Sequence, residues 1–291
     1  MTRHFLTGAE LTASEQHALL ARAGELKRDR LLSRALDGRS VALVFDKPST
    51  RTRVSFETGV HELGGHPLIL REGELQLARG ESPRDTALVL SRMVHAIAIR
   101  TGPHATVEEL ARHAAIPVIN MLTQEHHPCQ ALADLQTLLE RFGRLEGLKL
   151  AYVGDGNNMT RSLSIACGLA GVELAVATPP ELSLPELESV PLDEAVDGAH
   201  AIYTDVWVSM GDEAEAERKR ELLDPFRLDE GLLAKARDDA IALHCLPAHP
   251  GEEISEGVLY GERSAIWDQA ENRLHAQKAL LELLFSTLPP Q

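Results

Sequence analysis

A short junction near the N-terminus, residues 41–57, restricts the fold of this chain most. Residues 41–45 (Val-Ala-Leu-Val-Phe) are all apolar, as in a parallel strand buried on both faces. After a polar interval, Phe56 and Val60 recur at helical spacing. Pro48 disfavours helix immediately before Ser49, which is a good N-cap residue. A buried strand that runs directly into a helix predicts an α/β protein with a parallel sheet.

The helix start itself has the composition of an anion site. Residues 49–53 read Ser-Thr-Arg-Thr-Arg, so hydroxyl and guanidinium groups gather where backbone N–H groups are unpaired and the helix dipole favours negative charge. The alternative is an ordinary capped helix with surface arginines. The stretch lacks the Gly-Lys-Ser/Thr of a nucleotide P-loop and has no glycine before Gly59. We therefore expect a compact phosphate compound rather than a nucleotide.

The rest of the chain continues the alternation of strands and helices. An opening helix is predicted over 12–30, and Pro128 suits the first turn of a helix over 126–142. The stretch 178–192 holds four prolines, so it is not a regular helix throughout. The other predicted helices lie near 82–95, 106–114, 159–170, 229–237 and 271–285, the predicted strands near 66–70, 96–99, 117–121, 149–153, 172–177, 200–204, 240–245 and 265–267, and a loop over 74–82.

This order predicts an α/β fold with two doubly wound parallel-sheet domains. We expect a first domain over 1–126, a linking helix over 127–142 and a second domain over 143–268. Residues 269–291 form a C-terminal helix that we expect to return to the first domain.

Composition excludes several classes of function. A net charge of −15 argues against nucleic acid and anionic membranes as partners. The three cysteines match neither a zinc pattern nor a disulfide framework, so no metal site and no cofactor are expected. No signal peptide or membrane-spanning apolar run is evident, which favours a soluble cytoplasmic protein.

Five polar clusters follow predicted strands or begin predicted helices. Ligands of parallel α/β sheets bind beyond the carboxyl ends of the strands, so these clusters are candidate site residues. Each also has an ordinary explanation, such as a surface arginine, a helix cap or a small buried cysteine. The Gly-Asp-Gly-Asn-Asn turn at 154–158 lacks the third glycine of a dinucleotide site. The clusters are Arg100, His127 with Gln130, residues 154–158, Asp205 with 209–211, and residues 244–247.

Together these motifs resemble the transcarbamylase superfamily, and within it the ornithine carbamoyltransferases. The resemblance runs from about Arg3 to Leu284. It rests on Phe45-x-Lys47-Pro48 before the Ser-Thr-Arg-Thr-Arg stretch, His127-Pro128-Cys129-Gln130, Asp155-Gly156-Asn157-Asn158-Met159, Asp205-x-x-x-Ser209-Met210-Gly211 and His244-Cys245-Leu246-Pro247. It implies transfer of a carbamoyl group from carbamoyl phosphate to L-ornithine, with the first domain binding carbamoyl phosphate and the second binding ornithine.

The resemblance also implies a role for each site residue. The carbamoyl phosphate ligands would be Ser49, Thr50, Arg51, Thr52, Arg53, Arg100, His127, Gln130, Cys245, Leu246 through its carbonyl, Arg273, and Gln76 from a neighbouring subunit of a homotrimer. Thr52, Arg100, His127 and Cys245 would be the catalytic residues, with Cys245 positioning the amine. Ornithine would contact Asn158, Asp205, Ser209 and Met210. His127, at a helix N-terminus, should be neutral because the helix dipole disfavours its charged form.

Two departures from the family pattern stand out. The stretch 178–192 looks shorter than the corresponding family region, and we expect it to lie away from the motifs. Pro250 stands where many relatives carry arginine. Two alternative functions stay open: carbamoyl transfer to another amine such as putrescine, and a non-catalytic nucleotide- or phosphate-binding module.

Overall fold

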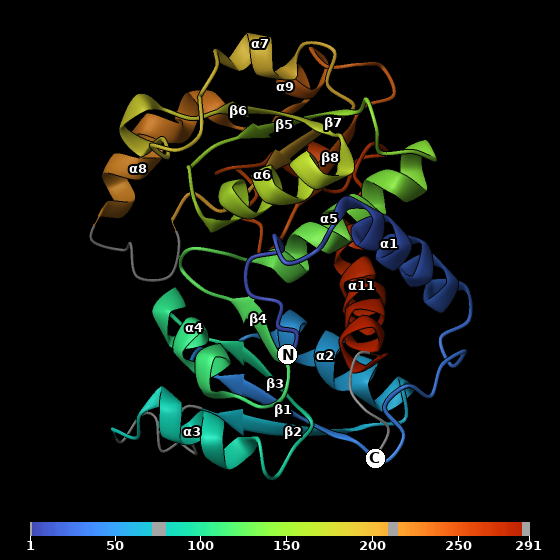
Figure 1. The fold of residues 1–291 in the computed structure, drawn as a ribbon. Helices are drawn as coiled ribbons and strands as arrows, with labels where there is room; N and C mark the ends of the chain where they lie inside the picture. Colours follow the sequence, from blue (N-terminus) through green and yellow to red (C-terminus); the bar gives the residue numbers. More distant parts are fainter. Residues whose placement is uncertain (1, 72–79, 209–214, 287–291) are drawn as a thin grey trace. The chain divides into compact units, whose positions relative to one another are not determined.

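The computed structural model describes residues 2–71, 80–208 and 215–286 (Figure 1). The described residues divide into two compact units, the first from those within 1–136 and 271–291 and the second from those within 137–270. Each unit is built around one four-stranded parallel sheet. The predicted α/β fold with two parallel-sheet domains is therefore confirmed.

The first unit has the strand order β2-β1-β3-β4. Its strands are β1 (Ser40–Phe45), β2 (His66–Arg71), β3 (Ala96–Arg100) and β4 (Val118–Leu122). Its helices are α1 (Ala13–Arg28), α2 (Thr50–Glu62), α3 (Pro83–Leu90) and α4 (His104–His113). Ala42, Val44, Ile97 and Ile99 pack with apolar residues of α3 and α4 in one buried cluster. The cluster fixes one face of the sheet, and α2 lies on the other side in Figure 1.

The second unit repeats the same topology with the strand order β6-β5-β7-β8. Its strands are β5 (Lys149–Val153), β6 (Glu173–Ala177), β7 (Ala201–Thr204) and β8 (Ile241–His244). Its helices are α6 (Asn158–Ala170), α7 (Leu192–Val196), α8 (Ala216–Leu223), α9 (Glu230–Leu233) and α10 (Glu256–Leu259). In Figure 1 the sheet lies between α6 on one side and α7 and α9 on the other. This layering buries both faces of the apolar strands, as parallel sheets require.

Two helices contain the boundaries between the units. The boundary at Gln136 falls inside α5 (Pro128–Phe142), and the boundary at Ala270 falls inside α11 (Ile266–Ser286). Among the residues that the structure describes, no helix combines the length and apolarity needed to cross a membrane.

Several predicted element boundaries were wrong. The strand predicted at 265–267 is absent: Ser264 makes one isolated bridge to Ala242, and α11 already begins at Ile266, five residues before the predicted start. The helix predicted over 82–95 ends at Leu90, and the helix predicted over 229–237 is limited to α9. The predicted loop over 74–82 lies largely outside the described residues. By contrast, Thr12 caps α1 with Glu15 in a capping box, as one of the two predicted caps.

Candidate functional site

The order of the first sheet singles out the ends of β1 and β3. Chain connections leave these adjacent strands in opposite directions, and ligands of open α/β sheets bind at such a switch point. Phe45 and Arg100 end the two strands as direct neighbours in register. Ser49 is the N-cap of α2, but its hydroxyl makes no capping bond to the helix. It accepts instead from Arg100 Nη1 at 3.2 Å, so the first N–H groups of α2 are not occupied by this side chain.

A second, fully buried network joins three of the predicted ligands. Arg273 is 3 % exposed, and its Nη2 donates to Thr52 Oγ1 at 2.6 Å while its Nη1 donates to Gln130 Oε1 at 2.8 Å. Gln130 Nε2 donates in turn to Asp134 Oδ1 at 2.8 Å. Arg273 therefore fixes the orientation of both Thr52 and Gln130. It leaves the Thr52 hydroxyl hydrogen to be donated elsewhere.

His127 is buried one residue before α5. Burial, followed by the charges of Arg273, Arg100 and Arg51, holds the pKa of its imidazole well below the usual range. This direction agrees with the predicted neutral state of His127, and it adds desolvation and the neighbouring arginines as causes. The result is a neutral N–H donor surrounded by three guanidinium groups, which suits a carbonyl oxygen that gains negative charge.

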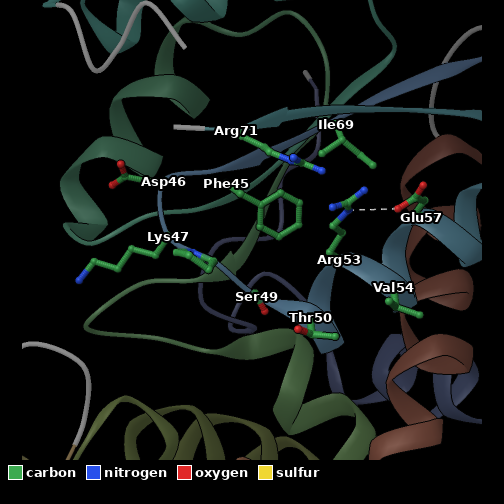
Figure 2. A pocket seen from close by; sticks show the side chains of 11 residues that line it. Phe45, Asp46, Lys47, Ser49, Thr50, Arg53, Val54, Glu57, Ile69 and Arg71 are labelled. Carbon is green, nitrogen blue, oxygen red and sulfur yellow. Dashed lines mark hydrogen bonds and ion pairs between the residues drawn. The ribbon is translucent and has the colours of Figure 1, made fainter. Parts of the chain in front are cut away.

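A cavity of about 620 Å³ lies beside the start of α2 (Figure 2). Ser49 and Thr50 belong to its lining, together with Lys47, Arg53 and Arg71. Figure 2 shows the Phe45 ring among the lining side chains and the Arg53 guanidinium directed at Glu57, with an Nε–Oε2 distance of 3.3 Å. Arg53 therefore lies toward this cavity, apart from the buried Thr52–Arg273–Gln130 network.

In the second unit, the matching switch point lies at the ends of β5 and β7. Asp205, 6 % exposed, accepts through Oδ1 from the Cys245 thiol at 2.8 Å and from the Val206 N–H at 2.8 Å. Its Oδ2 accepts from Asn157 Nδ2 at 2.8 Å. Asn157 is also the N-cap of α6, whose first residue is Asn158. The fold thus brings Asp205, Cys245 and the Asn157-Asn158 turn together, and a carboxylate fixed by three donors suits a cationic amine.

The stretch 178–192 contacts this turn, so the expectation that it lies away from the motifs was wrong. Within it, Pro180–Leu182 forms a short 3₁₀ helix, and no regular helix runs through the stretch. The Gly156 N–H donates to the Leu182 carbonyl at 3.0 Å. A Cβ at Gly156 would lie 2.4 Å from the same oxygen. The stretch therefore supports the Gly-Asp-Gly-Asn-Asn turn directly.

We predict that Gly156→Ala displaces this turn and weakens the binding of the ligand held by the second unit. The added methyl group meets backbone atoms of 182–184, which cannot swing aside as a flexible side chain can. An overpacked site of this kind costs about 1–3 kcal/mol. Thermal unfolding and ligand titration measure the effect, and Gly168→Ala is the matched control because, beyond the backbone of its own helix, no atom lies within 4 Å of its added Cβ. Equal behaviour of the two variants would contradict the prediction.

Asp205, His244 and Cys245 also bring three potential metal-ligating atoms within 4.8 Å of one another. Both ring nitrogens of His244 are already engaged, Nδ1 by the Leu246 N–H at 2.8 Å and Nε2 by Glu253 Oε1 at 3.2 Å. Only the thiol and the carboxylate remain, too few ligands for the tetrahedral protein sites of zinc. The geometry fits a hydrogen-bonded network better than a metal centre.

The remaining predicted site residues lie as follows, and three polar residues of the site were not predicted. Gln76, Ser209 and Met210 lie outside the described residues. Thr50 is exposed, Arg51 is half-buried, and Leu246 has a left-handed backbone with φ +60°. Three polar residues were missed: Asn157, which was inside a quoted motif, Glu253, and Lys219, whose Nζ lies 2.8 Å from Asp155 Oδ2. Asn157 was recognisable from its motif, whereas Glu253 and Lys219 look like surface charges in the sequence.

Comparison with known proteins identifies the family. Residues 3–140 match the family model "Aspartate/ornithine carbamoyltransferase, carbamoyl-P binding domain", and residues 146–284 match "Aspartate/ornithine carbamoyltransferase, Asp/Orn binding domain". The chain is 52% identical over 302 residues to an ornithine carbamoyltransferase of Acidothermus cellulolyticus, with 98% of this chain and 97% of that protein covered. It is 49% identical over 303 residues to that of Methanoculleus marisnigri, with 98% of each covered.

A solved structure gives the same result at the level of the fold. The ornithine carbamoyltransferase from Pyrococcus furiosus superposes with a TM-score of 0.94 at 45% sequence identity, covering 99% of this chain and 98% of that one. Both family models, the curated relatives and the solved structure therefore agree along nearly the entire sequence. The chain belongs to the aspartate/ornithine carbamoyltransferase family.

Proposed function

We propose that this protein is an ornithine carbamoyltransferase, which moves the carbamoyl group of carbamoyl phosphate to the side-chain amine of L-ornithine. The products are L-citrulline and phosphate, a reaction of arginine biosynthesis. Relatives that carry this name match along nearly the whole chain. The observation in the structure that carries the proposal is the Asp205–Cys245 pair, because a buried carboxylate that a thiol contacts at 2.8 Å suits an amine acceptor.

Carbamoyl phosphate is proposed to bind at the switch point of the first unit. The N-terminus of α2 with Ser49, Thr50, Arg51, Thr52 and Arg53 receives the phosphate, supported by Arg100. Arg100, Thr52 and His127 donate to the carbonyl oxygen. Gln130 and the Leu246 carbonyl accept from the carbamoyl amino group. Gln130 Oε1 already accepts one bond from Arg273, and a carbonyl oxygen has a second lone pair for this role.

The proposed reaction is direct acyl transfer without a covalent intermediate on the protein. The neutral ornithine amine attacks the carbamoyl carbon, so a C–N bond forms and the carbonyl oxygen gains negative charge. The C–O bond to phosphate then breaks, and the leaving phosphate accepts the amine proton. Cys245 positions the amine through its contact with Asp205, while Asn158, Ser209 and Met210 hold the α-amino and α-carboxylate groups.

The pH dependence of the rate should follow the ornithine amine and not His127. A lysine-like amine has a pKa of about 10.4 in water, and only its neutral form is a nucleophile. The pKa of His127 is held well below its usual range, so the imidazole stays neutral as the pH rises through about 6.5. We expect kcat/KM for ornithine to rise with pH without an inflection near pH ~6.5. An inflection there that disappears in His127→Gln would contradict the assignment.

The family resemblance supports a homotrimer with sites shared between subunits, which we include in the proposal. Gln76 of the neighbouring subunit would then join the phosphate site. The cavity beside Ser49 and Thr50, with Lys47, Arg53 and Arg71, offers room for a neighbouring chain. We also propose a cytoplasmic location, because Cys129, Cys167 and Cys245 form no disulfide in the described structure.

The first experiment offers ornithine, putrescine and aspartate separately to the protein with carbamoyl phosphate, and measures the ureido product. Citrulline formation alone supports the proposal. Product from putrescine or aspartate instead would keep the phosphate site and overturn the acceptor. A larger melting shift with nucleotides than with phosphate compounds, and no product, would favour the non-catalytic module.

A further inference from the structure

The turn after β8 has an unusual backbone conformation at Leu246, whose carbonyl is proposed to contact carbamoyl phosphate. Leu246 adopts φ +60°, the left-handed region, which leucine rarely occupies because its Cβ meets the following carbonyl. Such a conformation persists only where the surroundings impose it. Cys245 lies inside the same turn, so whatever imposes it also places the thiol that contacts Asp205.

His244 supplies the restraint. Its Nδ1 accepts from the Leu246 N–H at 2.8 Å, a side chain bonded to the backbone two residues on, as in an Asx turn. The backbone of His244 is held as well, because its own N–H donates to Gln269 Oε1 at 2.8 Å. The imidazole is 1 % exposed, so water does not compete for these bonds.

Glu253 determines the tautomer that makes this restraint possible. Because Nδ1 accepts, the ring proton of a neutral His244 must be on Nε2, which lies 3.2 Å from Glu253 Oε1. Glu253 is 0 % exposed, and the same oxygen also accepts from the His249 N–H. The buried carboxylate thus favours the one tautomer whose Nδ1 can hold Leu246.

We propose that Glu253 is a positioning residue for carbamoyl transfer, acting through His244 to hold Cys245 and Leu246 in place. This rests on the proposed function, which assigns the Leu246 carbonyl to the carbamoyl amino group and Cys245 to the amine. Glu253 touches neither substrate in this assignment. Replacing Glu253 should therefore weaken only the contacts that Leu246 and Cys245 make with the substrates.

The test compares Glu253→Leu with Glu253→Gln and with the neighbouring control Glu252→Gln, whose side chain pairs with Arg220 at the surface. Glu253→Leu removes the acceptor of the Nε2 proton, and we expect kcat/KM for carbamoyl phosphate to fall about 10²-fold, as a displaced contact typically causes. Gln retains an acceptor oxygen and should restore activity to within about threefold of the parent protein. Affinity for inorganic phosphate should not change in any variant, because phosphate is assigned to the first unit.

Two further measurements distinguish a failure of this proposal from a folding defect and from a failure of the proposed function. His244→Asn keeps a side-chain acceptor for the Leu246 N–H without Glu253, so adding Glu253→Leu to it should cost little further activity. The ¹⁵N spectrum of the histidines should show an Nε2–H tautomer that is absent in His244→Asn and altered in Glu253→Leu, whatever the enzyme acts on. An equal loss of phosphate affinity, no rescue by Gln, additive losses in the double variant, or an Nδ1–H tautomer in the parent protein would each overturn the proposal.

Discussion

Replacing Arg273 with lysine is expected to lower kcat/KM for carbamoyl phosphate by about 10²–10³-fold, the usual cost of losing a donor that stabilises the transition state. Arg273 is buried and donates from two different nitrogens, to Thr52 and to Gln130. A lysine ammonium is a single point charge and cannot span both acceptors in this geometry. Lysine keeps the positive charge of Arg273, so the loss of activity reports how Thr52 and Gln130 are oriented and not a change of net charge.

The physical reason lies in what Thr52 and Gln130 are proposed to do. With Arg273 in place, Thr52 Oγ1 accepts one hydrogen bond from the guanidinium, and the hydroxyl hydrogen is left for the carbonyl oxygen that Thr52 is proposed to contact. Without the second guanidinium bond, either Thr52 or Gln130 is left to reorient inside a dry pocket, where an unsatisfied polar group costs about 1–3 kcal/mol. Steady-state kinetics with each substrate varied in turn check the result.

The control is Arg112→Lys, the same substitution at a side chain that is 62% exposed and pairs with Glu109. It should leave both kcat and KM unchanged, since exposed ion pairs contribute little. Activity of Arg273→Lys close to that of the control, at equal thermal stability, would show that Thr52 and Gln130 need no orientation by Arg273.

Elements with a periodic or apolar pattern were predictable from the sequence. Residues 41–45 and 96–99 are apolar runs, and both became buried strands because burial on two faces leaves only such runs in a parallel sheet. Residues 265–267 look similar, yet they begin a helix. A short apolar run has no periodicity that separates strand from helix, and here Gln269 N already bonds to Ala265 O.

The candidate site was predictable only where its residues follow strands directly. Arg100 and Asp205 stand at strand ends, so the topology rule predicted their place. Glu253 and Lys219 lie among other charged residues, and no local pattern marks Glu253 as buried or Lys219 as the partner of Asp155. The partners of Glu253, at 244 and 249, are fixed by how the turn after β8 folds back, which is tertiary information.

The ion pair between Lys278 of α11 and Glu62 of α2 is likewise tertiary information that no local sequence pattern marks. Lys278 is 0 % exposed, and its Nζ lies 2.8 Å from Glu62 Oε2. Arg30 is a second partner of Glu62. We expect Lys278→Met to lower the free energy of unfolding by about 3 kcal/mol, because it leaves the buried Glu62 carboxylate with Arg30, whose side chain is 52% exposed, in place of a buried partner. Chemical denaturation at neutral pH measures the loss.

The control uses the same substitution at a surface pair. Lys235 Nζ lies 2.8 Å from Asp193 Oδ1, with the two side chains 55% and 80% exposed. Lys235→Met should change the free energy of unfolding by less than about 1 kcal/mol. Adding Glu62→Leu to Lys278→Met should recover part of the loss, since it removes the buried charge. Equal stabilities of Lys278→Met and Lys235→Met would contradict the buried pair.

The pH dependence of stability supplies an independent check. Burial acts to raise the pKa of Glu62, but the hydrogen bonds from Arg30 and Lys278 outweigh it and hold the pKa below the usual value. A carboxyl whose pKa is lower in the folded state stabilises the fold above its unfolded pKa, about 4.3, and this contribution is lost as the pH falls further. Without Lys278 the folded pKa of Glu62 rises toward that value. Lys278→Met should therefore lose less stability than the parent protein on acidification below about pH 4.3, and a parallel loss in both would show that Glu62 does not respond to Lys278.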